Sequence, residues 1–397
     1  MTGISARGLY KVFGNNPDKA VAALKSGTSR EELMEQGSTA AVIDASFDIE
    51  PGEIFVVMGL SGCGKSTLIR MVNGLLPATA GSLEIDGTSL TEMSESQLRS
   101  IRRDKISMVF QHFALLPHRT VAENAAYGLD IKGVSRKERE EKAREALKMV
   151  GLEGWDNHLP GELSGGMQQR VGLARALAAD TDVLLMDEAF SALDPLIRKE
   201  MQDQLINLQK ELNKTILFIT HDLNEAMRIG DRIAMMRAGE IVQIGSAKEI
   251  LQQPANDFVA NFVQDVDRSR VLSAGDIAQD TANVVSAHDD ISTAQDQLRE
   301  SDIPWVVVVD EDQRPTRVLW EKDLREAESQ GASALPETAA HHMHVVEENT
   351  TTYELFQFAA DSPSPIIVAD DDGRLTGTIS REVLLGAVAT DSKEVNA

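Results

Sequence analysis

Short apolar runs recur along the chain between turn-forming and charged residues. The clearest are IFVVM at 54–58, VLLM at 183–186 and TILFI at 215–219. Runs of this length and composition are typical of strands that are buried on both faces of a sheet. Segments with helical spacing lie beside them, at 68–72 and 171–178. This combination of buried strands and helices predicts an α/β fold.

Several more polar stretches carry the signals of helix ends. Residues 17–36 have helical spacing, and SREE at 29–32 matches a capping box, in which serine and glutamate satisfy free backbone amides. Further helices are predicted at 94–103 and 135–150. The second of these begins with Ser135 and Glu138 and stops at Gly151.

The C-terminal part of the chain contains a repeat. VVVDEDQRPTRVLWEKDL at 307–324 and IVADDDGRLTGTISREVL at 367–384 align without gaps at an offset of 60 residues. Each copy has the pattern strand, acidic turn, strand and helix, and a helical pattern precedes each copy, at 293–300 and 352–360. A unit this small cannot bury both of its faces, so the two copies should pair.

Composition narrows the possible classes of protein. The chain has 397 residues, enough for two or three domains, and contains no apolar run long enough to span a bilayer. Its single cysteine, Cys63, excludes disulfides and structural zinc sites built on cysteine. The first residues lack the apolar core of a signal peptide, which favours the cytoplasm.

The charge of the chain argues against a nucleic-acid partner, and its uneven distribution indicates a domain boundary. The formal net charge is −24, so no nucleic-acid partner is expected. From residue 268 to the end there are 10 basic and 25 acidic residues, a net charge of −15. The shift in composition near 265–274 separates a large first domain from an acidic C-terminal domain.

A glycine-rich segment between the first predicted strand and helix matches G-x-x-x-x-G-K-[ST]. Its backbone N–H groups and the dipole of the following helix would bind phosphates, with a lysine near the β- and γ-phosphates and a serine hydroxyl on Mg²⁺. The sequence therefore predicts a site for a nucleoside triphosphate with Mg²⁺. Its residues are Gly59, Ser61, Gly62, Cys63, Gly64, Lys65, Ser66 and Thr67.

Two carboxylates end the run at 183–186. Asp187 is placed to hold Mg²⁺, and Glu188 is placed to activate the attacking water. Strands often end in acidic residues at a loop, and the upstream phosphate loop is what favours the catalytic interpretation.

Ser164 is a predicted N-cap of the helix that follows LSGG at 163–166.

Together these motifs make the first domain similar to the nucleotide-binding subunits of ABC transporters. LSGG matches the family signature, Gln111 its Q-loop, SALD at 191–194 its D-loop and His221 its switch histidine. The resemblance implies a P-loop ABC ATPase domain with a RecA-like core, an antiparallel β subdomain and a helical subdomain. The expected domain spans 1–267, with a helical insertion at about 15–40.

The roles of the site residues follow from this resemblance. Two copies would face each other head to tail with two ATP molecules between them, so that Ser164 and Gly166 of one copy contact the γ-phosphate bound by the other. Gly165, Gln168 and Asp194 are further expected nucleotide-binding residues. Lys65, Gln111, Glu188 and His221 are the expected catalytic residues, and Ser66, Gln111 and Asp187 the expected metal ligands. Phe13 is the expected adenine-stacking residue, and Tyr10 is the alternative.

The insertion at 15–40 and the segments LMDEAFSALDPLIR and HDLNEAMRIGD resemble the ATP-binding subunits of glycine betaine/proline osmoprotectant importers. The repeat resembles the tandem CBS modules of those subunits, an α+β pair expected at 268–397 with repeats at about 271–330 and 336–390. The nucleotide-binding positions of each CBS module are incomplete, because Trp320 and Val383 replace the usual types, and a purely structural or dimerising pair is the alternative.

We therefore predict the ATP-hydrolysing subunit of an osmolyte importer that is regulated osmotically by its C-terminal domain. The expected partners are an integral-membrane permease, a second copy of the chain and, indirectly, an external substrate-binding protein. The permease would contact a surface at 111–127 that includes His112, Phe113 and Leu116. The expected location is the cytoplasmic face of the inner or plasma membrane. The alternatives are an importer for choline or an amino acid, and an ABC ATPase without a transport role.

Overall fold

The computed structural model describes residues 3–111, 113–264, 266–280, 283–301, 303–337 and 342–388. His112 of the expected permease surface therefore lies outside the described residues. The chain divides into two compact units, Met1–Val263 and Gln264–Ala397. Among the described residues, no helix combines the length and the apolar character needed to cross a bilayer.

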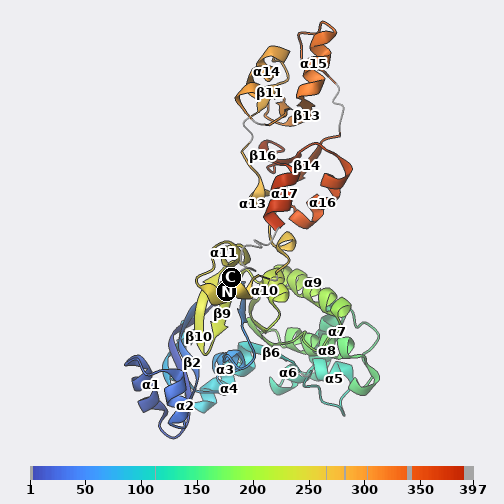
Figure 1. The fold of residues 1–397 in the computed structure, drawn as a ribbon. Coiled ribbons are helices and arrows are strands. Elements are labelled where there is room, and N and C mark those ends of the chain that lie inside the picture. Colours follow the sequence, from blue (N-terminus) through green and yellow to red (C-terminus); the bar gives the residue numbers. More distant parts are fainter. Residues whose placement is uncertain are drawn as a thin grey trace. The chain divides into compact units, whose positions relative to one another are not determined.

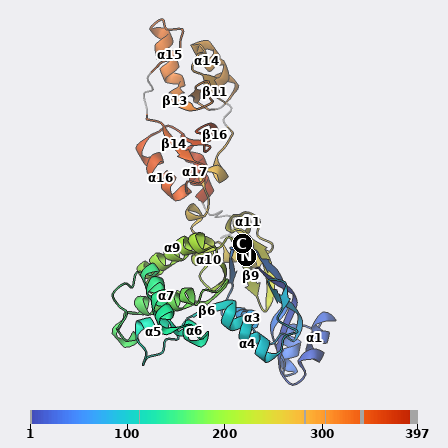
Figure 2. The ribbon, with the colours of Figure 1, turned by 180° about the vertical axis from the view of Figure 1, so that it is seen from behind.

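A six-stranded sheet forms the centre of the first unit (Figures 1 and 2). Its strand order is β10-β9-β3-β8-β7-β6, and all neighbours are parallel except β10 and β9. The three predicted apolar runs are its central strands. The strands are β3 (Ile54–Met58), β6 (Ile106–Phe110), β7 (Val183–Asp187), β8 (Thr215–Thr220), β9 (Arg232–Arg237) and β10 (Glu240–Gly245).

An antiparallel sheet of order β2-β1-β4-β5 packs beside the central sheet. One hydrophobic core contains buried residues of both sheets, and the stacked rings of Phe47 and Phe55, 5.5 Å apart, join them. The strands of this second sheet are β1 (Ile4–Phe13), β2 (Thr39–Ile49), β4 (Ala80–Ile85) and β5 (Thr88–Ser89).

The helices of the first unit fall into three groups (Figure 1). Two short helices cover the antiparallel sheet, four form a separate helical lobe, and the others accompany the central sheet. They are α1 (Pro17–Lys25), α2 (Arg30–Glu35), α3 (Lys65–Val72), α4 (Glu95–Asp104), α5 (Val121–Ala125), α6 (Tyr127–Ile131), α7 (Arg136–Met149), α8 (Gly165–Ala178), α9 (Pro195–Leu212), α10 (Leu223–Ile229), α11 (Ala247–Gln252) and α12 (Asp257–Phe262), with a 3-10 turn at Pro160–Glu162.

The predicted helix ends are present in the structure. Ser29 and Glu32 form a capping box at the start of α2, and the Ser135 hydroxyl accepts from the Glu138 amide at the start of α7. The helical segment at 17–36 is two helices, which bury Leu33 against a small core shared with β1 and β2.

The second unit contains the sequence repeat as two copies of one β-α-β-β-α arrangement. In each copy the first two strands are parallel and the last two antiparallel. The first copy contains β11 (Val284–Ser286), α14 (Ile291–Glu300), β12 (Trp305–Val309), β13 (Pro315–Trp320) and α15 (Glu321–Ser329). The second contains β14 (His344–Glu347), α16 (Thr352–Asp361), β15 (Ile366–Ala369), β16 (Leu375–Ile379) and α17 (Arg381–Val388).

The two copies share a core and exchange their leading segments. Ile367 of the second copy packs with Trp305, Val307 and Val318 of the first. A segment that precedes the first copy, containing η2 (Arg268–Arg270) and α13 (Ala274–Ile277), adds Gln279 to β16 of the second copy. In the reciprocal contact, Leu335 lies before the second copy but is buried in the core of the first.

Candidate functional site

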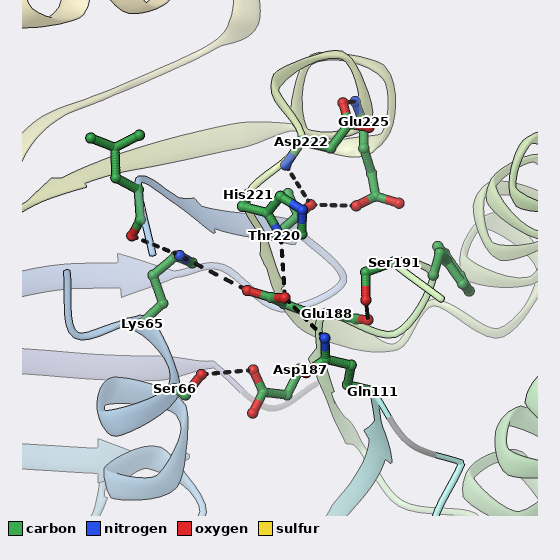
Figure 3. A network of polar contacts seen from close by, with 12 residues as sticks. Lys65, Ser66, Gln111, Asp187, Glu188, Ser191, Thr220, His221, Asp222 and Glu225 are labelled. Atoms are coloured by element: carbon green, nitrogen blue, oxygen red, sulfur yellow. Dashed lines mark hydrogen bonds and ion pairs between the residues drawn. The ribbon is translucent and has the colours of Figure 1, made fainter. Parts of the chain in front are cut away.

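The candidate site lies where neighbouring strands of the central sheet end. The register pairs Met58 of β3 with Thr220 of β8, Ile219 of β8 with Asp187 of β7, and Asp187 with Phe110 of β6. The residues that follow these strands therefore meet at one edge of the sheet (Figure 3). In parallel α/β sheets this edge is where ligands bind.

The loop between β3 and α3 needs glycine at two positions. Gly59 has φ +150°, and a Cβ there would lie 2.1 Å from the Met236 carbonyl oxygen. Gly64 has φ +108°, and a Cβ there would lie 2.1 Å from the Ala41 carbonyl oxygen. The loop thus packs against neighbouring backbone, in a conformation that side chains would not permit. Its amides are then fixed at the start of α3, the arrangement that binds phosphate.

The other predicted residues of this loop differ in their exposure to solvent. Ser61 and Gly62 are exposed, whereas the Cys63 side chain is buried in the core. Burial raises the pKa of the Cys63 thiol, so this residue offers its backbone rather than a thiolate. Thr67 lies in the first turn of α3, where its amide donates to the Gly64 carbonyl oxygen over 3.0 Å.

Lys65 is held in place by the loop that it follows. Its Nζ donates to the carbonyl oxygens of Gly59 and Leu60, over 2.8 and 3.1 Å, and lies 4.0 Å from Oε1 of Glu188. The side chain is buried. Desolvation of a buried cation is costly, so an anionic ligand at this edge would be strongly favoured.

Ser66 and Asp187 supply oxygen atoms of the kind that Mg²⁺ prefers. The Ser66 Oγ donates to Asp187 Oδ1 over 3.2 Å. Burial raises the pKa of Asp187, the Ser66 hydrogen bond lowers it, and the nearby Glu188 raises it. A hydroxyl and a carboxylate that contact each other beside a phosphate loop fit the usual protein ligands of Mg²⁺ bound to a nucleotide.

Glu188 is the residue at which the loops converge (Figure 3). Its Oε2 accepts from Gln111 Nε2 at 3.4 Å and lies 3.1 Å from His221 Nδ1. Its backbone has φ 47°, a left-handed conformation, and its amide donates to the Ile219 carbonyl oxygen over 2.9 Å. Strained backbone of this kind at a non-glycine residue is characteristic of functional sites.

The loop after Glu188 is fixed by Arg198 on α9. Its guanidinium donates to the carbonyl oxygens of Phe190 and Leu193, over 3.2 and 3.0 Å. Asp194 caps α9, because its Oδ1 accepts from the Ile197 amide at 3.1 Å. Asp194 is exposed, so its carboxylate is accessible at the surface.

The signature residues form a separate surface at the start of α8. Ser164 is the predicted N-cap, with its Oγ accepting from the Met167 amide at 3.3 Å. Gln168 donates to the carbonyl oxygens of Pro160 and Leu163 and so fixes the preceding turn. Between described residues, no hydrogen bond or ion pair joins Ser164, Gly165 or Gly166 to Lys65, Ser66 or Glu188. The structure of one chain thus does not bring these two groups together.

The two aromatic candidates for adenine stacking differ in exposure. The Phe13 ring is 43 % exposed at the end of β1, with Lys11 Nζ 5.2 Å from its centroid. Tyr10 is buried in the core beneath α1 and α2. Only Phe13 offers a ring face to a ligand.

Sequence reasoning missed the residues that support the site, namely Arg198, Gln202, Thr220, Asp222 and Glu225. The signal for three of them was present in the segment THDLNE at 220–225, which directly follows a buried strand. Arg198 and Gln202 lie one helical turn apart on α9, and nothing in the local pattern indicates that this helix packs beside the loop after β8.

A phosphate loop, paired carboxylates after the neighbouring strand and a histidine after the next define a P-loop nucleotide-hydrolysing protein. A family model described as "ABC transporter" matches residues 42–191. The chain is 49 % identical over 395 residues to the glycine betaine transport ATP-binding protein OpuAA of Bacillus subtilis, covering 99 % of this chain and 94 % of OpuAA.

A second relative is the glycine betaine/proline betaine transport system ATP-binding protein ProV of Escherichia coli. It is 46 % identical over 397 residues, covering 99 % of this chain and 98 % of ProV. Among solved structures, the ATP-binding cassette MJ0796, a dimer bound to ADP and Pi, matches with 34 % identity and a TM-score of 0.53. That match covers 62 % of this chain and 98 % of MJ0796.

This chain belongs to the ATP-binding subunits of ABC transporters, and it is an ATPase. The first unit has the ABC ATPase fold that was expected from the sequence motifs.

Proposed function

We propose that this chain powers the import of glycine betaine, proline betaine or a related osmolyte through a membrane permease. The observation that carries this substrate class is the similarity to OpuAA and ProV along nearly the whole chain, including the repeat. A match confined to the ATPase unit would support an importer of unspecified substrate. Choline and amino acids would then be as well supported as betaine.

The proposed site uses residues that lie at the strand ends of the first unit. Lys65 and the amides of 59–67 bind the phosphates of ATP, and Phe13 stacks on adenine. Ser66, Asp187 and Gln111 are the proposed residues that hold Mg²⁺, which neutralises charge on the phosphates when it is bound. Glu188 orients and deprotonates the attacking water, and His221 holds the Glu188 carboxylate and the γ-phosphate in place.

We also propose that catalysis needs two copies. Ser164 and Asp194 are exposed and Gly166 is half-buried. Between described residues, no hydrogen bond or ion pair joins them to Lys65, Ser66 or Glu188, which supports a role on the nucleotide of the other copy. The dimeric structures of MJ0796 support the same assembly. The contacts of Ser164 and Gly166 with phosphate would then form only when the two copies approach each other.

The second unit supports a regulatory proposal. We assign 1–267 to the nucleotide-binding domain and 268–397 to a tandem CBS pair, because of the paired β-α-β-β-α copies and the change in charge. The compact units divide slightly earlier in the chain, after Val263. The −15 charge of the second region makes it responsive to ionic strength, since charges interact over a Debye length of about 8–10 Å at physiological salt. We also propose that an integral-membrane permease binds this subunit at the cytoplasmic face of the membrane, with an external substrate-binding protein as an indirect partner.

The substitution Glu188→Gln tests the proposed chemistry. It retains the shape of the side chain and the contact with Gln111, but removes the base, so ATP binding should persist while hydrolysis falls by at least about 10²-fold. The assays are Mg-ATP hydrolysis by the purified protein and labelled glycine betaine uptake by cells that express the chain with its permease.

The exposed Glu211→Gln on α9 is the matched control and should behave as wild type in both assays. Normal turnover by Glu188→Gln would exclude Glu188 as the base. If the wild-type protein hydrolyses ATP normally but cells that express it with its permease take up no labelled betaine, the proposed substrate class would be contradicted.

A further inference from the structure

The backbone around His221 is restrained on both sides. Thr220 ends β8, Asp222 is the N-cap of α10, and His221 is the single residue between them. The Thr220 Oγ1 accepts from the Asp222 amide at 3.0 Å and donates to the carboxylate of Glu225 (Figure 3). The turn that carries His221 is therefore closed by hydrogen bonds between the residues that flank it.

Glu225 is an unusual residue to find at this position. Its side chain is on a seven-residue helix but is only 4 % exposed. Its Oε2 accepts from Thr220 and its Oε1 accepts from Gln202 Nε2 at 3.1 Å, so both carboxylate oxygens have a donor. Burial raises the pKa of Glu225, and the two hydrogen bonds lower it. Burying a carboxylate is costly, and a well-packed apolar side chain at the same place would often be the more stable choice.

The helix α9 supports this turn from the other side. Arg198 and Gln202 are four residues apart and so lie on one face of the helix. Arg198 Nη1 contacts Asp222 Oδ2 at 3.2 Å, and Gln202 contacts Glu225. Arg198 also holds the Phe190 carbonyl oxygen in the loop that follows Glu188. One helix face thus sets the positions of the loop after β7 and the loop after β8.

The side chain of His221 depends on this backbone. It is 54 % exposed, and between described residues its imidazole makes one polar contact, with Glu188. Since no second polar contact of the ring is found in the described part of the chain, the direction of the His221 Cα–Cβ bond decides whether Nδ1 reaches Oε2 of Glu188.

We propose that Glu225 is a positioning residue for His221. Its buried carboxylate holds the Thr220 hydroxyl, Thr220 holds the Asp222 amide, and the turn between them directs His221 to Glu188. The inference rests on the proposed roles of His221 and Glu188. It predicts that Glu225 affects turnover only through His221, although no hydrogen bond or ion pair joins the two described side chains.

A double-mutant cycle on the full-length protein tests this coupling. Glu225→Ala should lower kcat for Mg-ATP hydrolysis by about 10-fold or more and change KM by less than about 2-fold, because a displaced catalytic group affects the transition state more than binding. In the His221→Ala background, the same substitution should lower kcat by less than about 2-fold, since the group that it positions is already absent.

Conservative variants separate positioning from a loss of folding. Glu225→Gln keeps an oxygen acceptor for Thr220 and should retain kcat within about 3-fold. Thr220→Ser keeps the hydroxyl and should also be active, whereas Thr220→Val should repeat the loss seen in Glu225→Ala. The exposed Glu211→Ala serves as the control, and the melting temperature of each variant reports on folding.

The outcomes distinguish this inference from the proposed function. Equal losses from Glu225→Ala in the wild-type and His221→Ala backgrounds, or wild-type turnover by Thr220→Val, would overturn the positioning role. Wild-type turnover by His221→Ala would show instead that the assignment of the switch histidine is wrong. If Glu225→Ala does not fold, the Thr220 pair and Glu225→Gln decide the question.

Discussion

At the scale of single residues, the site combines several groups whose ordinary preference is for water. Asp187 and Glu225 are carboxylates whose pKa burial raises, and Lys65 is a buried cation. Glu188 adopts a left-handed backbone conformation. Each of these features lowers stability unless a ligand or a neighbouring group offsets it, and such groups concentrate at functional sites. We therefore expect these functional groups to lower the stability of the ligand-free protein.

The substitution Asp187→Asn should stabilise the ligand-free protein and abolish its function. A carboxylate with a raised pKa destabilises the folded state at neutral pH, and this penalty decreases as the pH falls through that pKa. Removing the charge should therefore raise the melting temperature of the ligand-free protein at pH 7, by about 2–4 °C for each ~1 kcal/mol removed. The gain should shrink at acid pH, and hydrolysis should be lost.

Scanning calorimetry at pH 7 and pH 4.5, with and without Mg-ATP, measures this effect. The control is Asp180→Asn, whose carboxylate is exposed and lies 3.8 Å from Lys214 in a weak surface ion pair. A ligand-free Asp187→Asn protein that melts below the wild type at pH 7 would contradict the proposed balance.

At the scale of elements, the sequence predicts those strands, helix caps and repeats whose signal lies in residues adjacent along the chain. The apolar run at 54–58, the Ser135 cap and the repeat at an offset of 60 residues all have their signal within a short window, and each matches an element of the structure. The contacts of Arg198 and Gln202 with the loop after β8 depend on how α9 packs. Packing joins residues that are distant in sequence, so the pattern of a single segment does not reveal it.

The inserted helices α1 and α2 provide a prediction at this scale. Leu33 is 2 % exposed and belongs to the core shared with β1 and β2, whereas the adjacent Met34 is 66 % exposed. Leu33→Ala should destabilise the insertion by about 2–4 kcal/mol, because it leaves a cavity. Met34→Ala should have little effect.

Limited proteolysis within 15–40 and the denaturant midpoint measure the difference between these two variants. Faster cleavage is expected for Leu33→Ala alone. Equal cleavage of both variants would mean that the insertion is not held by this core. Because Tyr10 is in the same core and Phe13 follows it in β1, a weaker affinity for ATP is expected in Leu33→Ala.

At the scale of the whole chain, two features point beyond a single polypeptide. Among the described residues, no hydrogen bond or ion pair joins the signature residues Ser164 and Gly166 to the phosphate loop of their own chain, which agrees with the proposal that two copies form each site. The net charge of −15 from residue 268 onward suits a response to salt rather than to a specific anion.

Deletion of 273–397 tests the proposed regulatory role of the second unit. The first unit contains every proposed catalytic residue, so Mg-ATP hydrolysis by the shortened chain should stay within about 3-fold of the wild type. Betaine uptake should lose its dependence on osmolarity. Uptake by the shortened chain that responds to osmolarity as the intact chain does would contradict the regulatory proposal.

The reciprocal exchange of leading segments in the second unit has a consequence for how this region can be divided. Gln279 forms a bridge with Thr378 of the later copy, and Leu335 fills the interior of the earlier one. Neither half is therefore complete in its own stretch of sequence. A fragment boundary drawn between the copies would leave both halves with an open edge, so the pair must be excised, transplanted or inherited as one indivisible module.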